Sequence, residues 1–465
     1  MALKVSIDHR STSPTSLLAP LPSITSYSIP FRVPGSQRDR HMLHYFCVQG
    51  SNDISGFLNC DFWSQTVLQE SHQDPTVRQA LVAMSSIHLH YSTPGTSENS
   101  VVSTEILAQY GKALRSMKMR LSKPSQDTVK VALICCIMFY CCEGALGSRD
   151  AALQHLRNGL NLLIATKNDP REKILWDIQT ISSVFERLDM QASFFEDDRT
   201  PVLTLPELRP GETKPGTFTF EDKFARIQDA QQSLVRLQAW LYHFVDKNAD
   251  FHDEAMDSLP LSIVQEKAVI MEAYDSWITA AKHLEAEVPN DTEYLEGIKT
   301  LLVQYHICRM IMESKFPNDP QVFGASPNPS AHKVLDLAQA LLHPKVLSEE
   351  SFKVRERSRP KYSLETGVVA PLFALALKCS DESVAIRATQ MLGSLQRREG
   401  LYDSQTMARI IAALKDTRDQ EMCIKQQFNG ESKEVTALEY HLPSSYLGGG
   451  IDKLLSSMDL VRLVN

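Results

Sequence analysis

The segment VALICCIMFYCCEG, residues 131–144, is the feature that most restricts the folds open to this chain. Its part from Val131 to Cys142 contains no charged residue. A helix that is apolar on every side has to be covered by other elements on every side. The run is also shorter than the roughly 20 residues that cross a bilayer as a helix. The segment therefore predicts a buried helix inside a multi-helix protein, and no membrane span.

The residues that follow this run predict a helical hairpin. Gly144 and Gly147 are expected to end the first helix, and Ser148 can cap a second one with Asp150 in its first turn. The second segment carries leucines at one-face spacing, namely Leu153, Leu156, Leu160 and Leu163. Two helices joined by a short turn that contains glycine form an αα-hairpin.

Apolar side chains recur at spacings of three and four residues along most of the chain. Asp74-Pro75 is a typical helix start, a capping residue followed by proline. Further helices are expected near residues 106–121, 172–192, 221–247, 261–287, 292–314, 331–343, 365–379, 382–396 and 404–424. Strict alternation is scarce and no fixed-period repeat is present. The prediction is an all-α fold, a multi-helix domain of antiparallel helical hairpins.

Composition divides the chain into three parts. Residues 1–30 are rich in Ser, Thr and Pro and predict a disordered arm without a signal-peptide pattern. Residues 31–428 carry the helical pattern, and residues 429–465 form a less regular tail. Nine cysteines, an odd number, in a long chain favour free thiols in a reducing compartment.

The four cysteines of the opening segment could be a metal site, a redox site or core. On a helix Cys135 and Cys142 share a face about 10 Å apart, whereas Cys136 and Cys141 point elsewhere. Helical metal ligands need i, i+3 or i+4 spacing, and the chain contains no C-x2-C. Core packing is the favoured interpretation, with a redox sensor as the alternative.

Histidines are weak candidates for ligands. His88 and His90 would point to different sides of a helix, and His88 continues an apolar face, so a core histidine is expected. His41 and His44 are three residues apart and form the other candidate pair.

Basic residues could contact phosphates. They comprise Lys112, Arg115, Lys118, Arg120 and Lys123, opposite the apolar face of residues 106–121, and the segment RERSRPK at 355–361. The first set is typical of a solvated helix face, and the second resembles a nuclear-import signal as well as an ordinary loop. A net charge of -8 and a pI of about 6.0 argue against a chain that binds nucleic acid over its whole surface.

Catalytic motifs do not emerge. GGG at 448–450 lacks the Lys-Ser/Thr of a P-loop, and the pair Asp197-Asp198 has no convergent partner. We therefore predict no catalytic, cofactor-binding or metal-binding residue and no cofactor.

Five segments, in order, resemble the regulatory region of fungal zinc binuclear-cluster transcription factors, the fungal-specific transcription factor domain. They are 57–91, 106–122, 131–163, 184–195 and 364–404. Matching positions in the first and third are Phe62-Trp63, Val67-Leu68-Gln69, Ser71-His72, Pro75, Val77-Arg78, Ala80, Cys136, Phe139, Cys142-Glu143, Gly147, Ala151-Ala152, His155-Leu156 and Gly159-Leu160. The resemblance covers roughly residues 31–426.

Three departures from the family pattern stand out. Family members usually begin with a six-cysteine module that holds two zinc ions and reads DNA, and no cysteine precedes Cys47 here. Tyr402 stands where the family favours Trp, and Ala370 where Pro is usual. DNA reading therefore cannot be carried over residue by residue, and two explanations stay open: this sequence lacks an N-terminal module that the gene encodes, or the protein is a natural relative without that module.

The resemblance implies a fungal transcriptional regulator in the nucleus that controls a metabolic or secondary-metabolite gene set. Without its own zinc cluster, it would act through protein partners, either the transcription machinery or a DNA-binding factor, with no membrane contact. A homodimer is compatible with the resemblance. Two alternatives stay open: a helical scaffold or co-regulator, and a small-molecule binder or enzyme on a borrowed fold.

Overall fold

The structure is a computed structural model, and it describes residues 34–58, 60–93, 103–125, 127–167, 175–195, 201–203, 223–251, 254, 256–287, 292–313, 323, 326–342 and 361–415. The predicted arm at 1–30 and tail at 429–465 lie outside these residues, as do both proposed domain boundaries. Most of the described chain is helical, so the all-α prediction is confirmed.

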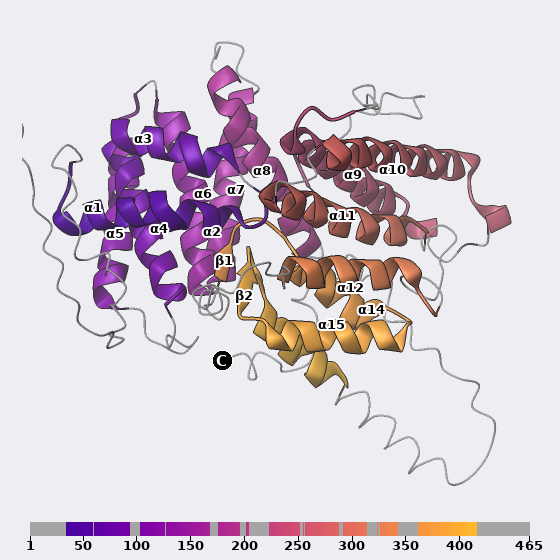
Figure 1. Cartoon of the computed structure of the whole chain (residues 1–465). Coiled ribbons are helices and arrows are strands. Elements are labelled where there is room, and N and C mark those ends of the chain that lie inside the picture. Colours follow the sequence, from indigo (N-terminus) through magenta and orange to yellow (C-terminus); the bar gives the residue numbers. More distant parts are fainter. Residues whose placement is uncertain are drawn as a thin grey trace, which may run out of the picture.

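The first group of elements forms the block on the left of Figure 1, in indigo to magenta. It contains α1 Gln37–Tyr45, α2 Ser51–Ser55, α3 Val67–Gln73, α4 Pro75–Tyr91, α5 Thr104–Ser122, α6 Thr128–Leu146, α7 Arg149–Lys167 and α8 Leu175–Phe195, with π-helical turns η2 Phe46–Gly50 and η3 Phe62–Thr66. Helix α6 lies between α4 and α7, so the apolar segment is enclosed as predicted. The helix starts follow local chemistry: the Asp74 carboxylate accepts the N–H groups of Thr76 and Val77, and Pro75 opens α4.

The turn between α6 and α7 differs in one detail from the prediction. Gly147 ends α6 in the left-handed conformation (φ 80°), but Gly144 lies inside the helix. A Cβ at Gly144 would lie 2.8 Å from the Tyr362 hydroxyl, so this glycine allows a distant segment to approach the helix closely.

Three long helices form the second group, at the upper right of Figure 1: α9 Ile227–Lys247, α10 Leu261–Glu287 and α11 Thr292–Glu313, with short 3-10 turns η4 Ala249–Phe251 and η5 Met256–Ser258. Trp240, Trp277 and Tyr305 are central to its apolar cluster. The Trp277 indole stacks on Tyr305 and donates to the Ala230 carbonyl at 3.0 Å. The predicted ranges for these helices agree with the structure to within a few residues, except that α9 begins six residues late.

The third group combines helices with a small sheet: α12 Pro329–Leu342, α14 Val369–Lys378, α15 Glu382–Ser394 and a helix at 404–415, with β1 Lys361–Ser363, β2 Arg397–Glu399 and β3 Tyr402–Asp403. Strand β2 pairs in parallel with β1 and antiparallel with β3. The sheet was not predicted, because three-residue strands leave no alternation to detect. The turn between β2 and β3 holds Gly400 at φ 57°.

The sheet attaches the end of the described chain to its beginning. The Leu364 N–H donates to the Ile54 carbonyl at 2.8 Å, and the Arg398 guanidinium donates to the Gly144 carbonyl at 3.0 Å. Segment 361–403 is therefore part of the packing of the first group (Figure 1).

Candidate functional site

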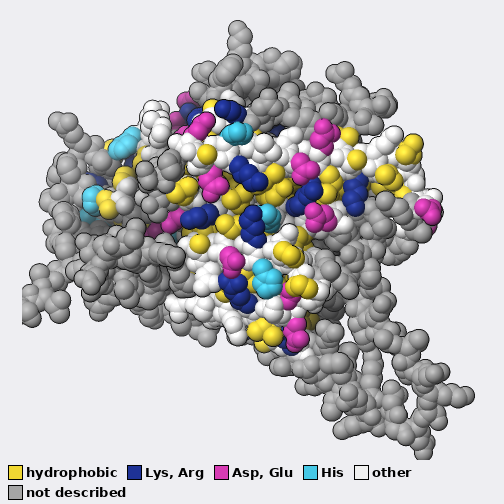
Figure 2. Space-filling model, turned by 45° about the vertical axis from the view of Figure 1, so that its right-hand side comes forward, with side chains coloured by type: hydrophobic (Ala, Val, Ile, Leu, Met, Phe, Trp, Pro, Cys, Tyr) yellow, Lys and Arg dark blue, Asp and Glu magenta, His cyan; other side chains and the backbone are white. Residues whose placement is uncertain are grey.

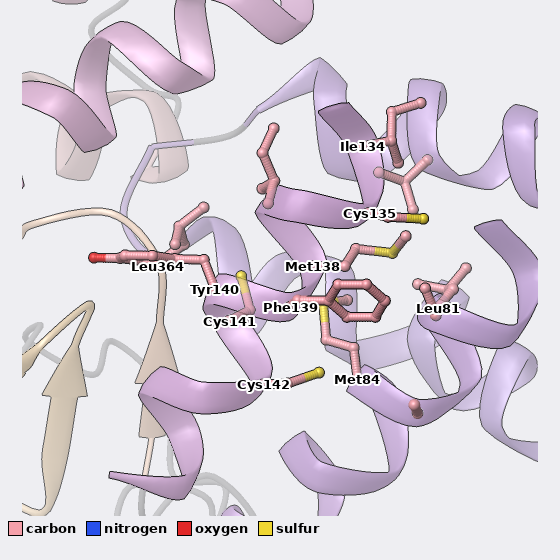
Figure 3. Close-up of a cluster of buried hydrophobic side chains, with 14 of the residues drawn as sticks. Leu81, Met84, Ile134, Cys135, Met138, Phe139, Tyr140, Cys141, Cys142 and Leu364 are labelled. Carbon is pink, nitrogen blue, oxygen red and sulfur yellow. The ribbon is translucent and has the colours of Figure 1, made fainter. Parts of the chain in front are cut away.

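The four cysteines of α6 lie in the interior of the first group. Cys135, Cys141 and Cys142 are buried, and Cys136 is partly buried against the same cluster. Figure 3 shows Cys135 and Cys142 on the side of Leu81 and Met84, with Cys141 on the side of Leu364. The core interpretation of these residues is confirmed.

Burial also makes these thiols poor nucleophiles. It raises the pKa of Cys136 to about 11 and raises the pKa of Cys135 and Cys142 well above the usual value. Within the described residues no group of three or more His, Cys, Asp or Glu side chains is arranged to hold a metal ion. Helix α6 does have the length and composition of a membrane span, but 67% of its most apolar window is buried inside the protein, which is typical of a core helix.

His88 is the core histidine that the periodicity of α4 predicts. Its Nδ1 is 2.7 Å from the Tyr45 hydroxyl and its Nε2 is 3.2 Å from the Tyr362 carbonyl. Burial lowers the pKa of His88, so the neutral ring joins α1, α4 and β1. His41 and His44 both lie on α1 and form no metal cluster with other described residues.

The basic side chains of α5 do not form one uniform surface. Lys112, Arg115 and Lys118 are exposed, whereas Arg120 pairs with Asp74, the cap of α4, at 3.3 Å. Lys123 is exposed as well, so the solvated-face prediction holds for every member of this set except Arg120. Residues 355–360, Asp197-Asp198 and 448–450 lie outside the described chain.

A buried ion pair, which sequence reasoning missed, lies where the groups meet. The Arg187 Nε atom on α8 donates to Glu365 Oε1 at 2.8 Å, and both side chains are 9% exposed. Arg187 also donates to the Ser183 carbonyl and to the Cys60 thiol. The partners are 178 residues apart, so no local pattern could have indicated the pair.

A second buried carboxylate fixes the start of α14. Glu399, on β2, is fully buried and accepts the N–H groups of Gly367 and Val369, each at 2.8 Å. Arg397 donates to the same carboxylate at 2.5 Å. This capping holds α14 against the sheet, next to the Arg187–Glu365 pair.

A cavity of about 180 Å³ lies beside this pair, between α8, α9, α11 and α14. Its apolar wall includes Val235, Ile307, Ile311, Phe373, Ala374 and Leu377. Because α8 connects the first group to α9–α11 (Figure 1), side chains from all three groups reach the cavity. This cavity has the features of a small-molecule pocket, namely an apolar interior with a few polar groups.

Four glutamines belong to the polar part of this wall. Gln304 donates to the Thr366 carbonyl at 2.9 Å, and Gln238 approaches Gln304 at 3.5 Å. Gln231 also lines the cavity. Gln191 is buried, and its Nε2 has no hydrogen-bond partner among the described residues. A buried amide without a partner is costly, so this residue stands out.

Comparison with known proteins finds a family match in the first group. Residues 41–197 match the family described as the fungal specific transcription factor domain. This part of the chain is therefore similar to a fungal specific transcription factor domain. The match covers α1 to α8, including the α6–α7 hairpin on which the resemblance relied.

Two curated relatives are transcription regulators. The chain is 31% identical over 126 residues to the transcription regulator lscL of Purpureocillium lilacinum, covering 26% of this chain and 30% of the relative. It is 21% identical over 427 residues to the aspercryptin biosynthesis cluster-specific transcription regulator atnN of Emericella nidulans, covering 75% of this chain and 68% of the relative. No solved structure matches the chain.

Proposed function

We propose that the chain is a fungal transcriptional regulator that acts in the nucleus and controls a secondary-metabolite gene set. The family match over residues 41–197 carries this proposal. Support comes from the relative atnN, whose alignment extends over 75% of this chain and therefore beyond the matched domain. We assign the role to regulation and not to catalysis, and we propose that residues 31–428 act as one regulatory domain.

DNA recognition is proposed to come from a protein partner. The nine cysteines contain no C-x2-C pair, so this sequence offers no zinc-cluster ligands. On the face in Figure 2, Lys and Arg side chains are interspersed with Asp and Glu. Among the described residues, ion pairs such as Arg309–Asp275 (3.2 Å) also neutralise basic side chains. DNA binding needs a surface on which positive charge accumulates, and this face does not provide one.

Chromatin mapping tests the proposal most directly. The tagged chain is expected to enter nuclei and to accumulate at promoters of one biosynthetic gene cluster, and deletion of its gene should change the transcripts of that cluster at least severalfold. Exclusion from nuclei under every growth condition would contradict the proposal. Nuclear entry without promoter enrichment would favour the helical scaffold.

A gel-shift experiment tests the partner. The purified chain should bind promoter DNA only at the weak, strongly salt-dependent level of non-specific contacts. Addition of the DNA-binding protein that co-purifies with the chain should give a slower complex than that protein gives alone. Sequence-specific binding by the chain itself, or zinc at one ion or more per molecule, would refute the partner-dependent mechanism.

A further inference from the structure

The cavity between α8, α9, α11 and α14 has a size that suits a small organic ligand. An apolar cavity of about 150 Å³ is large enough to hold benzene, and this one measures about 180 Å³. Its apolar wall consists of aliphatic and aromatic side chains, among them Ile307, Phe373 and Leu377. Shape and lining therefore suit one ring with a small substituent.

Three charged side chains line the cavity: Arg187 and Glu365, which neutralise each other, and Lys378, which is only partly buried at the end of α14. Arg187 and Glu365 form a buried pair at 2.8 Å, and the Arg187 guanidinium makes two further contacts. A charged group of a ligand that lies beside this buried pair, away from Lys378, would be an unpaired charge at a large cost in desolvation. An uncharged ligand avoids that cost.

Gln191 indicates the polar group that the ligand needs. Its side chain lines the cavity and is 7% exposed, yet its Nε2 has no partner among the described residues. The position of this amide requires a glycine at residue 400, because a Cβ there would overlap the Gln191 amide. In the structure this Nε2 lies against Gly400 and is shielded, so the amide has to turn away from the β2–β3 turn before a carbonyl or hydroxyl oxygen of a ligand can accept its hydrogen bond.

We propose that this cavity binds an uncharged, ring-sized effector that carries an amide, carbonyl or hydroxyl group, with Gln191 as its polar contact. The walls come from all three groups of helices. An occupant therefore stabilises their relative arrangement and couples the first group to α9–α15. The proposal concerns binding alone and stands whether or not the chain acts at promoters.

Fluorine NMR on the full-length purified chain tests the site with three probes of equal size. 4-Fluorobenzamide is neutral and polar, 4-fluorotoluene lacks the polar group, and 4-fluorobenzoate is charged. We expect 4-fluorobenzamide to bind with a Kd of about 1 mM or below, which is ordinary for a ligand of this size. The other two probes should bind at least about fivefold more weakly. Equal affinity for all three, or no binding of the benzamide, would overturn the proposal.

One variant locates the site and a second variant serves as its control. Ala374→Phe fills the cavity from α14 and should abolish benzamide binding. Ala268→Phe makes the same change on the exposed face of α10 and should leave the Kd unchanged. Equal loss of binding in both variants, or in neither, would refute the assignment.

Gln191→Met separates a ligand contact from a structural role. The Met side chain has a similar shape and removes the unpaired amide, so the melting temperature without ligand should stay the same or rise. The Kd for 4-fluorobenzamide should increase about tenfold, while that for 4-fluorotoluene should not. A fall in melting temperature with unchanged affinity would show that Gln191 serves only the fold.

Discussion

The interior around α6 and the junction around the cavity are both buried, but they are built differently. Around α6 the contacts are apolar, with Phe139 and three thiols packed among helices that are close in sequence. At the junction, glutamines from α8, α9 and α11 lie beside an ion pair whose two partners are 178 residues apart. The apolar packing around α6 stabilises the first group of helices. The junction is the region where a bound ligand would change how the three groups pack against one another.

Truncation of aromatic side chains offers the largest test of this contrast. Phe139→Ala should lower the free energy of unfolding by about 3–5 kcal/mol, because Phe139 is surrounded by tightly packed atoms, including the rings of Tyr110 and His155. Phe373→Ala, in the cavity wall, should cost roughly 2 kcal/mol, because that ring already faces empty space. Urea denaturation measures both, and equal losses would remove the distinction between the two regions.

Substitution of the ion pair at the junction should give the second-largest loss in the free energy of unfolding. Arg187→Met leaves the Glu365 carboxylate buried without its partner, which should cost about 3 kcal/mol. The double variant Arg187→Met with Glu365→Leu should recover most of that loss, since no charge then remains buried. Arg226→Met breaks an exposed pair with Asp229 and should cost less than about 1 kcal/mol. A double variant no more stable than Arg187→Met would contradict this account.

Acid sensitivity gives the smallest effect and concerns the α4 region. Burial lowers the pKa of His88 in the folded protein below the usual value of about 6.5. Below pH 6.5 the unfolded chain therefore binds more protons, and stability falls as the pH decreases towards the folded pKa. This histidine contributes up to about 1.4 kcal/mol per pH unit. The His88→Gln variant should show a shallower loss between pH 6.5 and 5, and identical slopes would refute the assignment.

The sequence predicted the helices well because their signals are local. The capping by Asp74, the turn at Gly147 and the apolar periodicity of α6 each lie within a few residues of the feature that they specify. The start of α14 at Val369, four residues after the predicted start, and the sheet escaped prediction, because Glu399 and Tyr362 act on partners that are distant in sequence. The cavity could not be predicted either, because the sequence around Gln191 and Gln304 is typical of ordinary helices. Only the folded chain brings these two side chains into one wall.

The attachment of β1 to the first group has a consequence for folding during synthesis on the ribosome. Residues 41–197 span the whole family match, but the Leu364 N–H that binds the Ile54 carbonyl and the Tyr362 carbonyl that contacts His88 Nε2 both belong to segment 361–403. At a synthesis rate of about 5–20 residues per second, that segment follows residue 197 by roughly 10–30 s. During this interval the nascent domain exposes surface that chaperones can recognise. A premature stop codon before Lys361 would therefore leave an intact family match in a protein that the cell degrades.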